Sequence, residues 1–249
     1  MSEIKTGREA LSRTAALLGD DALRRLQRAR VAVFGVGGVG GYVVEALVRS
    51  GVGTVDVFDK DDVSVSNLNR QIIALHSTVG QDKVSVIAAR MRDINPDVII
   101  HEHKMFYLPE NADEIDLTRY DFVVDAVDTV SAKIELAVRC ERLHVALIAA
   151  MGAGNKLDPS RLQISDIYKT SVCPLARAMR TALRKKGVKR LTVAYSTEEP
   201  VRPAQPVAAD GVTLPGSRRK DVPASAAFVP SAMGLLIASH VVQSLAAAK

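Results

Sequence analysis

The chain has 249 residues, of which 47% are hydrophobic and only 4% aromatic. This size and composition suit one large domain, or one domain with an appendage, with the aliphatic core that is typical of parallel strands. The formal net charge of +5 is a modest basic bias, and the two cysteines, Cys140 and Cys173, form no Cys-x-x-Cys pair, which argues against a disulfide framework and a structural zinc site.

Strands and helices are predicted to alternate through most of the chain. A helix is expected over residues 8–28, followed by strand 30–34, helix 39–50, strand 54–59, helix 81–94, strand 97–103, a short helix near 109–115, strand 121–127, helix 131–142 and strand 145–149. Strands joined by helical crossovers of this kind give a doubly wound, Rossmann-like, mostly parallel α/β sheet.

The regular alternation of strands and helices ends after Gly154. A strand near 162–167, a helix over 174–187 and a strand over 191–195 are predicted to form a C-terminal strand and helix extension. The segment 199–224 is rich in Pro, Ala and Gly and is expected to be a long, mobile loop. We therefore divide the chain into an N-terminal helical arm (1–29), a Rossmann-like core (30–155) and the extension (156–249).

Residues 228–248 are apolar enough to suggest a membrane span. Pro230, Ser239, His240 and Gln243 lie within this segment, and such residues are unfavourable in hydrocarbon. We therefore predict a buried helix and no membrane association. Residues 1–10 are polar, so we expect no secretory signal peptide and a cytoplasmic protein.

A glycine-rich turn follows the first predicted strand. Gly35, Gly37, Gly38 and Gly40 permit a tight turn and let backbone N–H groups approach a phosphate at the positive end of the next helix. Asp59 ends the following strand, where a carboxylate can accept hydrogen bonds from ribose hydroxyls. The order of strand, turn, helix, strand and acid predicts a nucleotide site rather than a purely structural turn.

Two cations and one acid are placed to meet a triphosphate. Asn67 and Arg70 follow Asp59 closely, Lys83 begins a helix, and Asp128 stands at the carboxyl end of a strand. In open α/β sheets that edge is where ligands bind. The cations can neutralise phosphate oxygens and the acid can hold Mg²⁺, so this set favours ATP with Mg²⁺.

A basic segment lies in the extension, where Pro174 to Leu191 includes seven basic residues and no acidic one. Exposed helices normally mix charge signs, so this run favours a phosphate-rich partner over a merely solvated surface. Few aromatic residues stand nearby, so contact is expected mainly with a nucleic-acid backbone. The side chains that we expect to bind it are Lys169, Arg177, Arg180, Arg184 and Lys185.

These motifs resemble those of the ubiquitin-activating-enzyme-like adenylating superfamily, and within it the tRNA threonylcarbamoyladenosine dehydratases. The resemblance extends from Ser12 to the C-terminal helix. It rests on Gly35-x-Gly-Gly-x-Gly40, Asp59, Ser66-Asn67-Leu-Asn-Arg70-Gln71, Lys83 and Asp128, and more narrowly on Arg30-to-Gly40, His76-Ser-Thr-Val-Gly80, Asp166-Ile-Tyr-Lys169-Thr170, Pro174-Leu-Ala-Arg177 and Tyr195-Ser-Thr-Glu198.

The resemblance implies an ATP-dependent enzyme that cyclises N6-threonylcarbamoyladenosine in tRNA. It implies that the glycine turn faces the α-phosphate, Asp59 the ribose and Asp128 the magnesium ion, and that Asn67, Arg70 and Lys83 hold the phosphates. It also implies a homodimer in which an N-terminal arginine reaches the partner's site. Arg13, six residues before Gly19, matches that arginine and would complete a catalytic set of Arg13, Arg70, Lys83 and Asp128.

Three other interpretations stay open at this point. One is adenylation of the C-terminal glycine of a ubiquitin-like sulfur carrier, although the zinc-binding cysteine pairs of such enzymes are missing. Another is a nicotinamide-dependent oxidoreductase, which leaves Arg70, Lys83 and Asp128 unexplained, and the third is a non-catalytic nucleotide-binding regulator. Cys173 lies where some relatives use a reactive cysteine, and the resemblance leaves open whether a sulfur-transfer protein is a partner.

Overall fold

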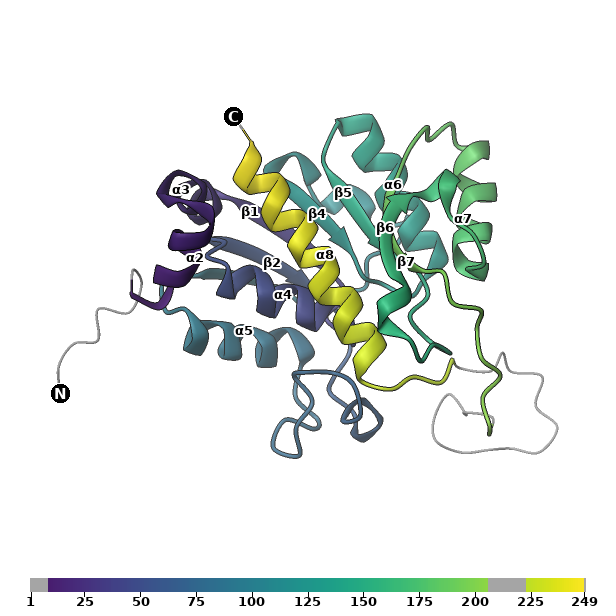
Figure 1. Ribbon diagram of the computed structural model, residues 1–249, viewed down its shortest axis with the longest axis horizontal. Helices are drawn as coiled ribbons and strands as arrows, with labels where there is room; N and C mark the ends of the chain where they lie inside the picture. Colours follow the sequence, from purple (N-terminus) through teal and green to yellow (C-terminus); the bar gives the residue numbers. More distant parts are fainter. Residues whose placement is uncertain (1–8, 206–222, 249) are drawn as a thin grey trace.

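A seven-stranded sheet lies at the centre of the protein in the computed structural model, which describes residues 9–205 and 223–248 (Figure 1). The strands are β1 (Arg30–Phe34), β2 (Thr54–Phe58), β3 (Ile99–His103), β4 (Phe122–Asp125), β5 (Leu147–Ala150), β6 (Leu162–Asp166) and β7 (Thr192–Ser196), in the order β3-β2-β1-β4-β5-β7-β6. All neighbouring pairs are parallel except β6 and β7. The predicted doubly wound, mostly parallel α/β fold is confirmed.

Helices cover both faces of the sheet. On one face, α4 (Gly40–Arg49), α5 (Lys83–Ile94) and α8 (Phe228–Ala247) pack on alternate side chains of β1 and β2, including Val33 and Val55. On the other face, α6 (Val130–Leu143) and α7 (Pro174–Lys185) pack on side chains such as Ala32 of β1 and Val193 of β7. The core is almost entirely aliphatic, as expected for parallel strands buried on both sides.

The apolar C-terminal helix α8 runs across the sheet beside α4 (Figure 1). By length and composition it could cross a membrane, yet half of its most apolar stretch is buried inside the protein. Gly234 allows a close approach to α4, because a Cβ atom there would lie 2.5 Å from the carbonyl oxygen of Val39. The second turn of α8 therefore packs on the start of α4, and the predicted buried helix is confirmed.

Several predicted elements have different bounds. The helix predicted over 8–28 is two helices, α2 (Ser12–Leu18) and α3 (Asp20–Arg28), because Gly19 has a φ angle of 86° that a continuous helix does not allow. The strand predicted over 121–127 ends at Asp125, and the short helix near 109–115 is instead a pair of 3₁₀ turns, η2 (Ala112–Glu114) and η3 (Leu117–Arg119). The predicted mobility of 199–224 falls mainly on 206–222, outside the described residues.

Backbone and aromatic contacts hold the carboxyl ends of the strands in register. The Gly35 amide donates to the Phe58 carbonyl at 2.7 Å, and the Asp59 amide donates to the His103 carbonyl at 3.2 Å. The rings of Phe34 and Phe58 stack 4.3 Å apart, and the His103 ring stacks on Phe58 at 4.2 Å. These contacts therefore fix the positions from which the loops after β1 and β2 begin.

Candidate active site

The glycine turn after β1 divides into two structural glycines and two that packing does not require. At Gly35 a Cβ atom would lie 2.7 Å from the Ala126 carbonyl oxygen, and at Gly40 it would lie 1.8 Å from the Gly35 carbonyl oxygen. At Gly37 and Gly38 the nearest atoms to such a Cβ are 3.6 and 3.5 Å away, which is ordinary contact. Glycine at those two positions therefore fits close approach of a ligand to the backbone.

Asp59 is tied to the glycine turn through its carboxylate. One oxygen accepts from the Val36 amide and the other from the Asp61 amide, both at 2.9 Å. The Lys83 ammonium lies 3.0 Å from an oxygen of Asp61 and 4.0 Å from Asp59, and Lys83 is only 5% exposed. The residue predicted to bind ribose and one of those predicted to bind phosphate are therefore neighbours at this edge of the sheet.

The loop after η1 (Val65–Asn67) holds Asn67 and Arg70. Asn67 is buried, and its side-chain oxygen accepts from the Ser64 amide at 3.1 Å. Arg70 is half-buried, and its Nη1 donates to the Ser66 carbonyl at 2.9 Å. Its Cγ atom is the one that lies 3.5 Å from the Cβ position of Gly38, so the arginine stem borders the glycine turn.

Gln71 was not predicted as a site residue. It is 7% exposed, its Oε1 has no hydrogen-bond partner, and its Nε2 lies 3.6 Å from the Cβ position of Gly37. A buried amide oxygen without a partner is unfavourable by about 1–3 kcal/mol, so it commonly marks a place that a ligand or water completes. The available signal was its position directly after Arg70 in the motif.

The loop after β4 has a buried ion pair at its base. Lys133 and Asp125 are both fully buried, with their charged atoms 2.9 Å apart, and Lys133 also donates to the Val127 carbonyl at 3.0 Å. Burial raises the pKa of the Asp125 carboxyl group, and the Lys133 ammonium opposes that rise. Asp128 is exposed beyond this base, and among the described residues only the Thr129 hydroxyl donates to it, at 3.3 Å. Lys133 was not predicted as a functional residue. Its ion pair with Asp125 depends on which face of α6 the lysine occupies, and the local sequence does not show this.

Asp128 does not lie in a ready-made metal cage. In the part of the chain that the structure describes, no three His, Cys, Asp or Glu side chains come together to hold a metal ion. Mg²⁺ bound with a nucleotide needs only one or two carboxylates, because phosphates and water supply its other ligands. An exposed aspartate at the ligand-binding edge of the sheet fits that kind of site.

Arg13 lies away from these residues. It is exposed on α2, and the neighbouring Leu11 packs against Gly51, which precedes β2 at the amino edge of the sheet. The glycine turn and Asp59 follow the strands at the opposite edge, so each five-residue strand separates them by about 16 Å. Arg13 therefore does not join the site of its own chain.

The basic helix α7 presents most of its charge to solvent. The side chains predicted to bind nucleic acid that are exposed are Lys169, Arg177, Arg184 and Lys185. None of the predicted group forms a salt bridge within residues 9–205 and 223–248. Arg180 differs, because it is half-buried and donates to the carbonyl and hydroxyl of Thr170.

The two cysteines are both buried. Cys173 is 2% exposed at the start of α7, and its Sγ lies 3.8 Å from the Cβ position of Gly152. Lys156 lies close to that thiol, and burial lowers the pKa of its ammonium group, which donates to the Glu198 carbonyl. Cys140 is 1% exposed in the core, and burial raises the pKa of its thiol to about 12.

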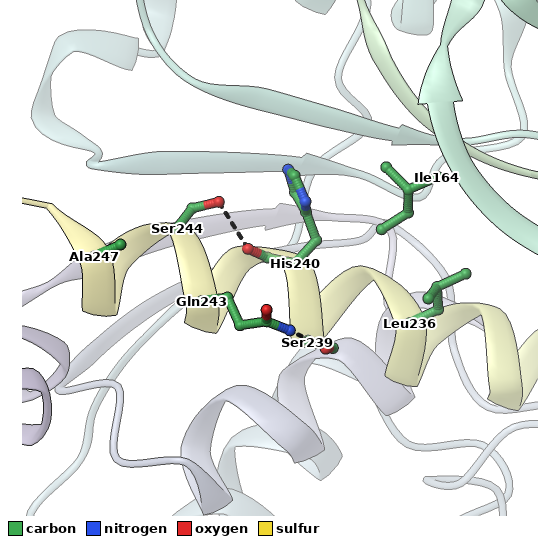
Figure 2. A pocket seen from close by; sticks show the side chains of 7 residues that line it. All are labelled: Ile164, Leu236, Ser239, His240, Gln243, Ser244 and Ala247. Atoms are coloured by element: carbon green, nitrogen blue, oxygen red, sulfur yellow. Dashed lines mark hydrogen bonds between the residues drawn. The ribbon is translucent and has the colours of Figure 1, made fainter. Parts of the chain in front are cut away.

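A separate groove of about 450 Å³ lies between α8 and the edge strand β6 (Figure 2). None of the predicted site residues lines it. Three of its polar side chains are hydrogen-bonded within α8: Gln243 donates to the Ser239 hydroxyl and Ser244 donates to the His240 carbonyl, each at 2.8 Å. The glycine turn and its neighbours therefore remain the candidate active site.

The whole arrangement can be compared with known proteins. A family model described as the ThiF family matches residues 11–249. The chain belongs to the ThiF family. The tRNA threonylcarbamoyladenosine dehydratase of Bacillus subtilis (strain 168) is 45% identical over 237 residues, covering 94% of this chain and 93% of that protein. The enzyme of the same name from Escherichia coli (strain K12) is 35% identical over 253 residues, covering 96% and 94%.

The same family likeness is seen in three dimensions. The crystal structure of the E. coli tRNA N6-threonylcarbamoyladenosine dehydratase in complex with ATP superposes with a TM-score of 0.86 at 32% identity, covering 98% of this ThiF-family chain and 97% of that one. The resemblance identified from the motifs is therefore confirmed.

The buried pair at the base of the Asp128 loop predicts a pH-dependent loss of stability. Lys133→Met is expected to lower the free energy of unfolding by about 3–5 kcal/mol, because it leaves Asp125 buried without its partner. The raised pKa of Asp125 then has no opposing charge, so the folded variant binds a proton more tightly than the unfolded chain. Its stability therefore falls as pH rises from about 3.9, the unfolded value, through the raised folded value.

Urea denaturation at about pH 5 and about pH 8 measures this effect, and the loss should be larger at the higher pH. The double variant Asp125→Asn with Lys133→Met is the control, because it removes both charges and should show no such pH dependence. Equal stability of Lys133→Met at both pH values would contradict the interpretation.

Proposed function

We propose that this protein is an ATP-dependent enzyme that cyclises N6-threonylcarbamoyladenosine in tRNA with loss of water. The observation that carries the proposal is that the Asp59–Lys83 pair and the stem of Arg70 both border the glycine turn, in a chain that matches dehydratases of this name over nearly its whole length. ATP fits the site because Gly37 and Gly38 leave the turn open to a phosphate and Gln71 offers an unpartnered polar group beside it.

The proposed reaction has two steps. The threonyl carboxylate attacks the α-phosphorus of ATP, which forms an acyl-adenylate and releases pyrophosphate. A nitrogen of the same modification then attacks the activated carbonyl carbon, closes a ring and expels AMP. The nucleophiles come from the substrate, so the protein acts by orientation and by stabilising negative charge.

The proposed roles follow from the placement of the side chains. Asp59 accepts from the ribose hydroxyls, and Lys83 and Arg70 neutralise phosphate oxygens. Asn67 holds the loop that carries Arg70, because its carbonyl accepts from the Arg70 and Gln71 amides, and we expect it to share in phosphate binding. Asp128 would hold Mg²⁺, which neutralises triphosphate charge when it is bound. The exposed face of α7 would contact the tRNA backbone, and we place the enzyme in the cytoplasm.

The alternatives are less well supported. A nicotinamide-dependent oxidoreductase would explain the glycine turn and Asp59 but not the cations beside them. Adenylation of a sulfur carrier would use the same nucleotide site, but it gives no role to the exposed basic face of α7. Cyclisation needs no covalent enzyme intermediate, so the buried Cys173 is expected to be dispensable.

One assay tests the proposed function directly. Purified protein is incubated with MgATP and either threonylcarbamoylated tRNA or a sulfur-carrier peptide that ends in glycine. AMP release and a product lighter than the modified tRNA by one water are expected only with the tRNA. AMP release or adenylation with the peptide alone would favour the sulfur-carrier alternative, and no turnover with either would contradict both.

The distance of Arg13 from its own site suggests that it acts in a partner subunit. Arg13→Ala is then expected to lower turnover by roughly 10²-fold, the scale of losing one charge-stabilising donor. Mixing Arg13→Ala with Asp128→Ala should restore activity, since each hybrid dimer contains one site with both residues. Random exchange of subunits would restore about a quarter of the wild-type rate.

The control for this mixing experiment is either variant incubated alone, which should stay inactive. Subunit exchange is verified with labelled chains. Failure to recover activity despite exchange would mean that Arg13 does not act across the interface.

The exposed face of α7 predicts a salt-dependent affinity for tRNA. Replacing Arg177 and Lys185 by Gln should flatten the log–log salt dependence of tRNA binding by about 1.4 to 1.8, because each neutralised phosphate contributes about 0.7 to 0.9. The KM for ATP should change little. These two residues suit the test better than Arg180, whose loss would also release Thr170.

The matched control replaces Arg24 and Arg28 of α3, two exposed arginines next to the amino edge of the sheet, by Gln. That variant has the same net charge and should keep the wild-type slope. Equal slopes for both double variants would show that α7 is only a solvated surface.

A further inference from the structure

Asn69 links two parts of the chain that lie far apart in the sequence. Its side-chain oxygen accepts from Arg70 Nη1 at 2.9 Å. Its side-chain nitrogen donates to the Ser225 carbonyl at 2.9 Å. Both bonding groups of one carboxamide are therefore in use, one toward the proposed phosphate ligand and one toward the segment 223–227 that leads into α8.

The segment 223–227 is anchored at its other end by Asn155. The Asn155 amide donates to the Ala224 carbonyl at 2.7 Å, and its side-chain oxygen accepts from the Ala224 amide at 2.8 Å. Asn155 has a φ angle of 57°, in the left-handed region that asparagine tolerates better than most residues. Pro223 packs against Gly154, where a Cβ atom would lie 2.6 Å from the proline ring.

The anchors of this segment lie on both sides of β4. Gly154 and Asn155 follow β5, and the segment continues into α8, whose Pro230 borders Gly38 after β1. Since β4 lies between β1 and β5 in the sheet, the segment 223–227 connects the loops that flank the end of β4. That end leads to Asp128, so the contacts of the segment lie on the two loops that flank the proposed Mg²⁺ ligand.

Asn69 also restricts the Arg70 guanidinium. Nη1 of Arg70 has two acceptors, the Ser66 carbonyl and Asn69 Oδ1. Neither Nε nor Nη2 of Arg70 forms a hydrogen bond within the described part of the chain. Because the guanidinium is planar, holding one nitrogen in this way sets the direction in which the other two can meet a phosphate.

We propose that Asn69 is a positioning residue that couples Arg70 to the segment 223–227, so that nucleotide phosphate bound by Arg70 also orders the wall beside which the second substrate is activated. This inference rests on the phosphate-binding role of Arg70 in the proposed function. The coupling is reciprocal by thermodynamic necessity: whatever orders the segment also favours nucleotide binding. A carboxamide suits the task because it has an acceptor and a donor on one short side chain, which neither aspartate nor alanine provides.

A double-mutant cycle on MgATP affinity tests the coupling to Arg70. Arg70→Gln should weaken MgATP binding at least tenfold, the scale of a charge-assisted hydrogen bond, and Asn69→Ala should weaken it about fivefold, the scale of a neutral one. The double variant should bind no more weakly than Arg70→Gln alone, because Asn69 acts through that arginine. Calorimetric titration with MgATP measures all four proteins.

Hydrogen exchange tests the link to the segment 223–227, with a readout that a general loss of stability would not reproduce. In the wild-type protein MgATP should slow amide exchange in this segment about fivefold. In the Asn69→Ala variant, amide exchange in segment 223–227 should be faster than in the wild type when no nucleotide is present. Saturating MgATP should no longer slow it. Asn95→Ala, which removes an asparagine at the end of α5 near the amino edge of the sheet, is the control and should respond like the wild type.

The outcomes separate this inference from the proposed function. If Arg70→Gln binds MgATP like the wild type, the phosphate role of Arg70 is wrong and the coupling is wrong with it. Two outcomes would overturn only the coupling. In the first, Arg70→Gln binds MgATP more weakly, but the double variant loses the sum of the two single losses in binding free energy. In the second, MgATP still slows amide exchange of segment 223–227 in the Asn69→Ala variant. No tRNA is used, so a different second substrate would not affect the result.

Discussion

The arrangement of the site depends on a steric constraint where β1, β4 and α4 meet. Gly35 leaves β1 with a φ angle of 85°, packed against the carbonyl of Ala126, and Gly40 begins α4 against the carbonyl of Gly35. Neither position has room for a Cβ atom, so the turn, the loop after β4 and the helix can approach one another only with glycine at both. The backbone amides of the turn, and the loop that leads to Asp128, take their places from this contact.

A buried ion pair further fixes the position of the loop after β4, at a cost in stability. The Lys133–Asp125 pair is completely buried, and desolvation of two such charges is commonly as large as their attraction. The same lysine donates to the Val127 carbonyl, next to Asp128. A hydrophobic pair could fill the same volume, but it could not hold that carbonyl. The ion pair is therefore better understood as a device that orients a loop than as a source of stability.

The sequence predicted the features that depend on local pattern. Buried strands, amphipathic helices and a glycine turn are recognisable within short windows, and the strand order brings Asp59 and Lys83 to one edge because parallel strands share a ligand-binding side. The break at Gly19 was missed because a single glycine is tolerated within a helical pattern.

Contacts between distant segments were not predictable. The hydrogen bond from Asn69 to Ser225 joins residues 156 positions apart, and nothing in either local sequence indicates it. The bond from Arg180 to Thr170 depends on how the loop before α7 folds back. Gln71 belongs to a recognised motif, but its unpartnered oxygen becomes visible only when its burial is known. These features require packing, which a one-dimensional pattern does not contain.

The position of α8 has a consequence for how the protein is made. This helix follows β1 to β7 in the sequence, yet Gly234 in its second turn packs on Val39 and its Pro230 borders Gly38 in the turn after β1. During synthesis the glycine turn emerges early, and the face of α4 stays uncovered until α8 has left the ribosome. Long-range contacts of this kind form late and leave apolar surface open in the meantime. The nascent protein therefore has its glycine turn long before it has a finished site, and the apolar face of α4 is open to chaperones in the meantime.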